Sequence, residues 1–276
     1  MALTVGGRPP PSSGGRDARP GARIPHCVRP LPVIFLVSME PTPLQIDVHF
    51  DFLCPWCFIG KRHLAAARDR LAELLPDVRT RVAWRSHLLL PDLPLQGVPY
   101  GPFYVARLGS AEAVAARRLQ VQQAARAAGL GLAFERITVM PNTAAAHDLV
   151  ALAAEVASEA RQADYVERVF GAYFVDGADI GDPAVLERLA VDSGLPRQQV
   201  QARLSDAPAV RKRRLRPPQQ AAAAVGGVPC FVFDGTIGLS GALPPEVLLD
   251  TMLRALRRPG SRELASAQPS SSLAPR

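Results

Sequence analysis

The chain has 276 residues and a hydrophobic fraction of 48%, enough for one large domain or two small ones with a sizeable core. Its net charge of +7 comes from its ends, because residues 1–43 carry a net +3, residues 254–276 carry a net +4, and the segment between them is neutral. A folded basic face that tracks phosphates is therefore not indicated, and we expect no specific nucleic-acid partner.

The first 43 residues are rich in Gly, Pro, Ser and Arg and show no periodicity before Leu31, so they are predicted to form a disordered extension. The apolar run at residues 31–37 is too short to span a bilayer and is not followed closely by a typical cleavage site. We expect no membrane association and a cytoplasmic location. Residues 259–276 are rich in Ser, Ala and Pro and are predicted to be a disordered tail.

The first regular elements flank a pair of cysteines. Apolar residues alternate with polar ones up to residue 50, which predicts a half-buried strand, and they take helical spacing from residue 58 onward. The apolar positions are Ile46, Val48 and Phe50 in the strand and Leu64, Ala67, Leu71 and Leu75 in the helix. Cys54 is therefore expected at a helix N-terminus, where unpaired N–H groups and the helix dipole favour a thiolate.

The segment Cys54-Pro55-Trp56-Cys57 places two thiols one helical turn apart, close enough to form a disulfide. We interpret Cys54 as the attacking thiol, Cys57 as the thiol that resolves a mixed disulfide, and Pro55 and Trp56 as modulators of the reduction potential. A structural disulfide and half of a zinc site are the alternatives. Zinc needs two further ligands, and the other two cysteines are isolated, so no metal is expected.

The remaining elements complete a β-α-β…β-β-α frame. A strand is predicted near residues 81–85, a loop over 90–102, and then about a hundred residues with helical periodicity. Within the helical stretch, Asp182-Pro183 is typical of a helix start. Two strands follow, at 230–233 and 236–239, joined by an Asp234-Gly235 turn, and a final helix is predicted over 244–256. The predicted boundaries are 44–93 and 207–258 for the two halves of the frame, and 94–206 for a helical insertion domain.

The segment 51–62 resembles the active-site segment of the DsbA-like thioredoxin superfamily, in its FrnE branch of dithiol oxidoreductases. That branch is related to 2-hydroxychromene-2-carboxylate isomerases and kappa-class glutathione transferases. Three later segments match in order, and the resemblance covers residues 44–256. They are Pro141-Asn142-Thr143 with His147, then Gly227-Val228-Pro229, then Ser240-Gly241-Ala242. The resemblance implies an α/β, thioredoxin-like fold with a large helical insertion domain.

The resemblance also implies site residues far from the dithiol. Pro229 is expected to be cis and to face the dithiol, leaving the backbone of Val228 free to pair with substrate, unless it simply opens an edge strand. Ser240 and Gly241 are expected near the substrate or glutathione, with an ordinary turn as the alternative. Cys230 is either a buried apolar residue or a third thiol near the site.

Three further features are left with open alternatives. His147 lies on a predicted helix and either lines the cleft or is structural or solvated. Asp51, at a strand end, either accepts the proton of Cys57 or stabilises a turn. The basic segment at residues 211–218 departs from the resemblance, and we expect a solvated loop there, broken by Pro217-Pro218.

The leading functional hypothesis is a thiol–disulfide oxidoreductase that oxidises, reduces or isomerises disulfides in proteins or small molecules. A glutathione-dependent isomerase or transferase on the same fold is the alternative, although those relatives carry Ser at the position of Cys54 and lack the second cysteine. A non-catalytic interaction module or chaperone is a third hypothesis. No cofactor is expected beyond glutathione as a co-substrate, and formation of a homodimer is left open.

Overall fold

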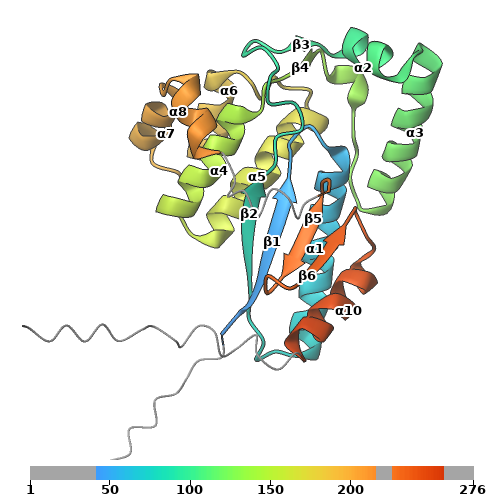
Figure 1. Ribbon diagram of the computed structural model, residues 1–276, viewed down its shortest axis with the longest axis vertical. Coiled ribbons are helices and arrows are strands. Elements are labelled where there is room, and N and C mark those ends of the chain that lie inside the picture. The colour runs from blue at the N-terminus through green and yellow to red at the C-terminus, as the bar shows by residue number, and fades with distance from the viewer. Residues whose placement is uncertain (1–41, 216–225, 258–276) are drawn as a thin grey trace, which may run out of the picture. The chain divides into compact units, whose positions relative to one another are not determined.

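A four-stranded mixed sheet in the order β2-β1-β5-β6 forms the centre of the computed structural model, which describes residues 42–215 and 226–257 (Figure 1). β1 and β2 are parallel, whereas β5 is antiparallel to β1 and β6 is antiparallel to β5. The strands are β1 (Leu44–Phe50), β2 (Thr80–Ser86), β5 (Cys230–Phe233) and β6 (Ile237–Ser240). The expected strand order along the chain is confirmed.

The alternating pattern of β1 buries one face of the strand, as predicted. Ile46, Val48 and Phe50 are almost fully buried, and the residues between them are half-buried. At the other end of the frame, β5 and β6 form a hairpin through Asp234 and Gly235, whose φ angles are +45° and +65°. The Thr236 N–H donates to the Phe233 carbonyl at 3.0 Å and closes a turn around this pair, and positive φ at both residues favours Asp-Gly. Phe233 pairs with Ile237, so β6 begins at Ile237 rather than at the predicted residue 236.

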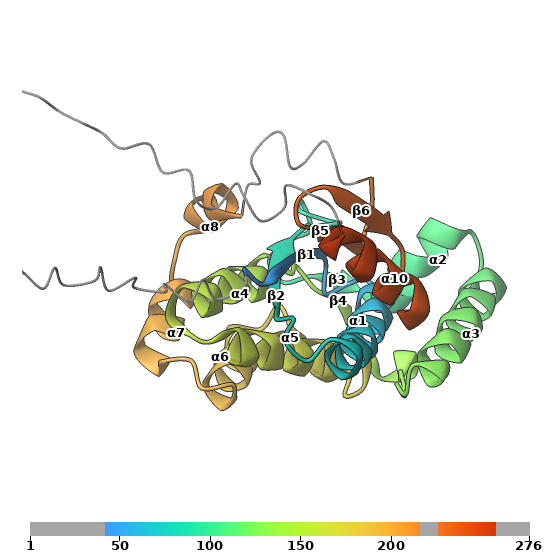
Figure 2. The ribbon, with the colours of Figure 1, turned by 90° about the horizontal axis from the view of Figure 1, so that it is seen from below.

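Along the sequence, a mostly helical segment lies between β2 and β5, which are part of the same sheet. This arrangement confirms the thioredoxin-like frame with a helical insertion. The helix α1 (Pro55–Leu74) joins β1 to β2 and packs against α10 (Pro245–Leu256), beside which it lies in Figure 2. The elements between β2 and β5 are β3 (Val98–Pro99), α2 (Tyr100–Leu108), α3 (Ala111–Ala127), η1 (Phe134–Arg136), β4 (Val139–Met140), α4 (Ala144–Val156), α5 (Glu159–Phe174), α6 (Pro183–Asp192), α7 (Arg197–Leu204) and α8 (Pro208–Arg214).

Two local expectations are wrong. The loop expected over 90–102 contains β3, which pairs with β4, and α2 begins within it at Tyr100. Leu75 is not part of the apolar face of α1, because the helix ends at Leu74 and Leu75 is partly exposed. Pro76 follows directly, and a residue that precedes proline is disfavoured in the helical conformation.

The basic segment at 211–218 is also not a solvated loop where the structure describes it. Residues up to Arg214 belong to α8, and Arg211 is buried. Pro208 occupies the first turn of this helix, where a missing N–H costs nothing. Arg211 and Arg214 form ion pairs with Asp148 of α4, a carboxylate that is almost fully buried. A buried carboxylate needs such partners, and these ion pairs join α8 to α4.

The expectations for residues 1–41, for Pro217-Pro218 and for the tail from residue 259 lie outside the described residues. Among residues 42–215 and 226–257, no helix combines the length and the apolar character needed to cross a membrane.

Candidate active site

Cys54 lies at the junction between β1 and α1. It has an extended conformation, with φ −93° and ψ 108°, and is the N-cap residue of α1, which continues directly with Pro55. Its N–H donates to the carbonyl of Asp51 at 3.0 Å, and its own carbonyl accepts the N–H of Cys57 at 3.0 Å. Cys54 is 8% exposed and Cys57 is 2% exposed, so Cys57 is the more deeply buried thiol.

The two thiols have opposite electrostatic environments. A hydrogen bond from the Cys57 side chain lowers the pKa of Cys54, and it outweighs the opposing effect of burial. Burial raises the pKa of Cys57 well above its ordinary value, and the neighbouring Cys54 adds to the rise. Cys54 is therefore the cysteine of this pair that ionises first as the pH rises.

The segment around Val228 and Pro229 meets the dithiol. The Val228–Pro229 peptide bond is cis, as the resemblance implies. The Sγ of Cys54 donates to the carbonyl oxygen of Val228 at 3.7 Å. Gly60 in α1 permits close packing here, because a Cβ at this position would lie 3.2 Å from the Pro229 ring and 3.1 Å from Phe231.

Ser240 and Gly241 support this segment from the neighbouring strand. The N–H of Gly241 donates to the carbonyl of Pro229 at 2.8 Å, and Gly241 has a φ of +96° that favours glycine. The turn does not coincide with the start of α10, which begins at Pro245. The hydrogen bond from Gly241 links this turn to the segment at Pro229.

Cys230 is buried and lies apart from the cavity beside Cys54. It pairs with His49 on β1 and with Ser240 on β6, so its side chain lies on the same sheet face as theirs. Burial raises the pKa of Cys230, while a hydrogen bond with Ser240 acts in the opposite direction. These observations favour the buried apolar role over that of a third thiol at the site.

A buried polar network lies behind the dithiol and is centred on Asp51. One carboxylate oxygen, Oδ1, accepts from the Leu53 N–H at 3.1 Å and the Thr143 hydroxyl at 3.1 Å. The Nε2 atom of His147 lies 3.4 Å from the same oxygen, and Oδ2 accepts the N–H of Leu89 at 2.5 Å. Asp51 and His147 are fully buried, so His147 does not line the cleft.

This network keeps Asp51 ionised. Burial acts to raise its pKa, but the hydrogen bond from His147 and those from the backbone N–H groups outweigh burial, and the pKa lies below its ordinary value. The charge of Asp51 in turn contributes to a higher pKa at both cysteines. The carboxylate accepts the N–H of Leu53 two residues along the chain, which is the contact of a turn, and its charge opposes formation of a second negative charge at the dithiol.

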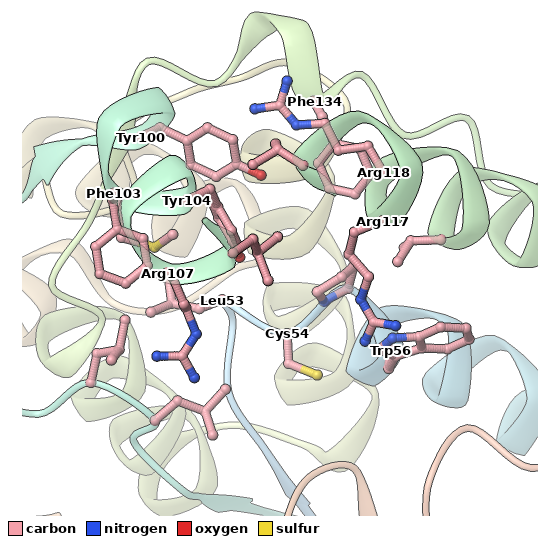
Figure 3. A pocket seen from close by; sticks show the side chains of 17 residues that line it. Leu53, Cys54, Trp56, Tyr100, Phe103, Tyr104, Arg107, Arg117, Arg118 and Phe134 are labelled. Carbon is pink, nitrogen blue, oxygen red and sulfur yellow. The ribbon is translucent and has the colours of Figure 1, made fainter. Parts of the chain in front are cut away.

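A cavity of about 330 Å³ opens beside Cys54 (Figure 3). Trp56 and Pro55 contribute to its wall from α1, while most of the lining comes from α2 and α3, whose residues recur there at spacings of three and four. These residues are Tyr100, Phe103, Tyr104, Arg107 and Leu108 on α2 and Val114, Arg117, Arg118 and Val121 on α3. None of these residues belongs to a recognised motif in the sequence, although such spacing marks one face of a helix.

The described residues contain no cluster of three or more His, Cys, Asp or Glu side chains suited to a metal ion. The chemistry that these residues provide is that of two thiols of unequal acidity, next to a cis-proline segment and an open cavity. A dithiol at the start of the first helix of a thioredoxin-like fold defines the class of thiol oxidoreductases.

The sequence matches the family described as DSBA-like thioredoxin domain over residues 45–253, and the chain belongs to that family. A search of curated protein sequences finds no match. Among solved structures, the chain is similar to a "probable DsbA oxidoreductase" from Streptomyces coelicolor, with 29% identity, a TM-score of 0.68, and coverage of 78% of this chain and 92% of that one.

Two more distant structures share the fold. The cytosolic disulfide reductase DsbM from Pseudomonas aeruginosa, solved with glutathione, has 19% identity and a TM-score of 0.53, with coverage of 78% of this chain and 100% of that one. A 2-hydroxychromene-2-carboxylate isomerase has 19% identity and a TM-score of 0.53, with coverage of 77% and 96%. The thioredoxin-like fold is therefore common to oxidoreductases and an isomerase.

Proposed function

We propose that this protein is a thiol–disulfide oxidoreductase in which Cys54 attacks and Cys57 resolves. The observation that carries the proposal is the unequal pair of thiols, one at the helix start with a lowered pKa and the other buried with a raised pKa. A thiolate is the nucleophile in disulfide exchange, and the deeper thiol is protected from attack until a mixed disulfide forms.

In the reducing direction, the Cys54 thiolate attacks one sulfur of a substrate disulfide, and the other sulfur leaves as a thiolate that takes up a proton. Cys57 then loses its proton and attacks the Sγ of Cys54, which releases the second substrate thiol. Two electrons pass from the dithiol to the substrate, and the Cys54–Cys57 disulfide remains. Oxidation of a substrate dithiol is the same sequence in reverse.

We assign Asp51 to the turn and to the charge balance of this cycle rather than to proton transfer. A carboxylate whose pKa lies below its ordinary value is a poor acceptor for the proton of Cys57, whose own pKa is raised. Its negative charge favours the protonated form of Cys57 while Cys54 is the thiolate. Val228, with its carbonyl facing Cys54, is proposed to offer backbone groups to an extended substrate.

The experiment that tests the proposal is reduction of insulin by dithiothreitol, with and without the protein, followed by trapping. The unmodified protein should accelerate insulin precipitation, and Cys54→Ser should abolish the acceleration. Cys57→Ser should accumulate mixed disulfides on non-reducing gels, because the resolving thiol is missing. Absence of both acceleration and adducts would reject the proposal.

We also propose a cytoplasmic location and glutathione as the reductant of the Cys54–Cys57 disulfide. The similarity in fold to a cytosolic disulfide reductase solved with glutathione makes this thiol the first to test. A redox titration of the pair in glutathione buffers would measure the equilibrium directly. Glutathione-dependent isomerisation or transfer remains the alternative function, and it predicts turnover that persists in Cys57→Ser.

A further inference from the structure

The cavity beside Cys54 has an unbalanced charge. Three arginines line it, and no Asp or Glu is among its lining residues. Within residues 42–215 and 226–257, none of Arg107, Arg117 and Arg118 forms an ion pair, and the Nε of Arg118 is buried without a hydrogen-bond partner. Elsewhere in the described structure many arginines are paired with carboxylates, as Arg203 and Arg214 are with Asp148.

Arg117 and Arg118 lie next to aromatic rings rather than to acids. The guanidinium of Arg117 is 5.9 Å from the ring centre of Trp56 and donates to the side-chain oxygen of Gln120 at 2.7 Å. The guanidinium of Arg118 is 5.1 Å from the ring centre of Tyr100. Arg118 also forms a hydrogen bond with Tyr100. A guanidinium next to an aromatic ring has five N–H donors, and those that remain can bind a carboxylate in a bidentate manner.

The remaining walls are apolar. Phe103 and Leu108 from α2 and Val114 from α3 contribute carbon surface, and Figure 3 shows the side chains of Arg107 and Arg117 on either side of Cys54 in this view. Burial raises the pKa of Tyr104, and the charge of Cys54 acts in the same direction, so the phenol stays neutral. The thiolate of Cys54 is thus the one anionic group that lines the cavity in the described structure.

We infer that this cavity binds the organic part of a small acidic disulfide or thiol, namely an apolar, ring-bearing group that carries a carboxylate. The inference rests on the proposed function and adds a substrate class to it. The ring packs against the aromatic and aliphatic walls, the carboxylate binds the arginines, and the sulfur faces Cys54. A volume of about 330 Å³ is within the range of small-molecule sites and holds one such group.

Three disulfides separate charge from shape in a stopped-flow experiment with the reduced protein. 5,5′-Dithiobis(2-nitrobenzoate) has rings and carboxylates, 4,4′-dithiodipyridine has neutral rings, and 3,3′-dithiodipropionate has carboxylates without rings. With each of them, Cys54 and Cys57 lose two protons and two electrons and form their disulfide, and one disulfide molecule becomes two thiols. Each rate is compared between unmodified protein and variant, so that the intrinsic reactivity of the probe cancels.

The informative variants are Arg117→Gln and Arg118→Gln, with Arg126→Gln as the matched control. Arg126 lies on the same helix, is exposed and does not line the cavity. We expect each cavity variant to slow oxidation by the dinitrobenzoate about tenfold, which corresponds to about 1.4 kcal/mol, and to slow the dipropionate less. The dipyridine rate should stay within about twofold, and the control should leave all three rates unchanged.

Arg118 also packs on Tyr100, so Arg118→Lys provides a variant that keeps the positive charge while losing the planar group.

Equilibrium binding of 4-(methylthio)benzoate, which has no reactive disulfide, is measured by calorimetry on Cys54→Ser, where exchange cannot contribute. Weaker binding in the additional presence of Arg117→Gln or Arg118→Gln would support the site whether or not the protein proves to be an oxidoreductase.

The outcomes distinguish the site from the function. If the variants slow all three disulfides and iodoacetamide equally, the arginines act only on the Cys54 pKa, and the inference is overturned. It is equally overturned if the dinitrobenzoate rate does not change while the dipyridine still forms the Cys54–Cys57 disulfide, a result that leaves the proposed function intact. If none of the probes forms that disulfide, the proposed function fails, and the binding measurement alone decides the inference.

Discussion

The carboxylate of Asp51 provides the sharpest prediction about the interior of the site. Asp51→Asn preserves the shape of the side chain but replaces one acceptor oxygen with an NH₂ donor. In the more favourable orientation of the amide group, its oxygen takes the place of Oδ1 and accepts the hydrogen bonds from Leu53, Thr143 and His147. The amide NH₂ then faces the N–H of Leu89, so that two buried donors oppose each other.

The magnitude follows from the cost of unpaired buried donors, which is about 1–3 kcal/mol each. We therefore expect Asp51→Asn to lower the free energy of unfolding by about 2–4 kcal/mol, or the melting temperature by roughly 5–15 °C for a protein of this size. Asp47→Asn is the matched control. It removes a charge from β1, just before Asp51 in the chain, and the ion pair of Asp47 with the exposed Arg85 contributes under about 1 kcal/mol.

The pH dependence has a definite sign. The pKa of Asp51 is lowered in the folded protein. Its contribution to the free energy of unfolding is therefore fully present above the unfolded pKa of about 4 and is lost as the pH falls through the folded pKa. The difference in stability between the unmodified protein and the Asp51→Asn variant should therefore be constant near neutral pH and shrink in acid. Urea unfolding across pH measures it. A loss no larger than that of Asp47→Asn would refute the reasoning.

Two other substitutions test the packing that positions the site. The added methyl group of Gly60→Ala should push against the Pro229 ring, lower the free energy of unfolding by about 1–3 kcal/mol and slow disulfide exchange. Gly238→Ala, where an added Cβ meets open space, should leave stability and exchange unchanged. Thermal melts measure the stability, and insulin reduction measures the exchange. Asp148→Asn should cost about 3 kcal/mol, because the buried Arg211 loses its carboxylate partner while Arg203 and Arg214 keep only their pairs with Glu155 and Asp206. The exposed Asp164→Asn should cost under about 1 kcal/mol. Equal effects in either pair would contradict the packing described.

The frame and the dithiol were predictable because their signals are local. Alternation in β1, the Asp234-Gly235 turn and the cysteines at the helix start each depend on a few consecutive residues. The Asp51–His147 contact and the Asp148–arginine cluster join segments about 96 and 66 residues apart, and no short window contains both partners. The loop expected for the basic segment was wrong for that reason, since its arginines have a buried partner in α4.

The cavity illustrates a signal that is present in the sequence but ambiguous. Tyr100, Phe103, Tyr104 and Arg107 have the spacing of one helix face, and so do Val114, Arg117, Arg118 and Val121. An apolar stripe of this kind is usually buried core. The arginines within the two stripes argue for an open site instead, but only the packing of α2 against α3 next to Cys54 shows that both stripes face one cavity.

The most direct test of the central claim is the rate of alkylation of each cysteine in the reduced protein as a function of pH, resolved by peptide mass spectrometry. We expect iodoacetamide to label Cys54 with a midpoint below the ordinary thiol value of about 8.5, while Cys57 and Cys230 stay unlabelled at that pH. Equal labelling of Cys54 and Cys57, or a Cys54 midpoint at or above the ordinary value, would contradict the assignment of Cys54 as the attacking thiol.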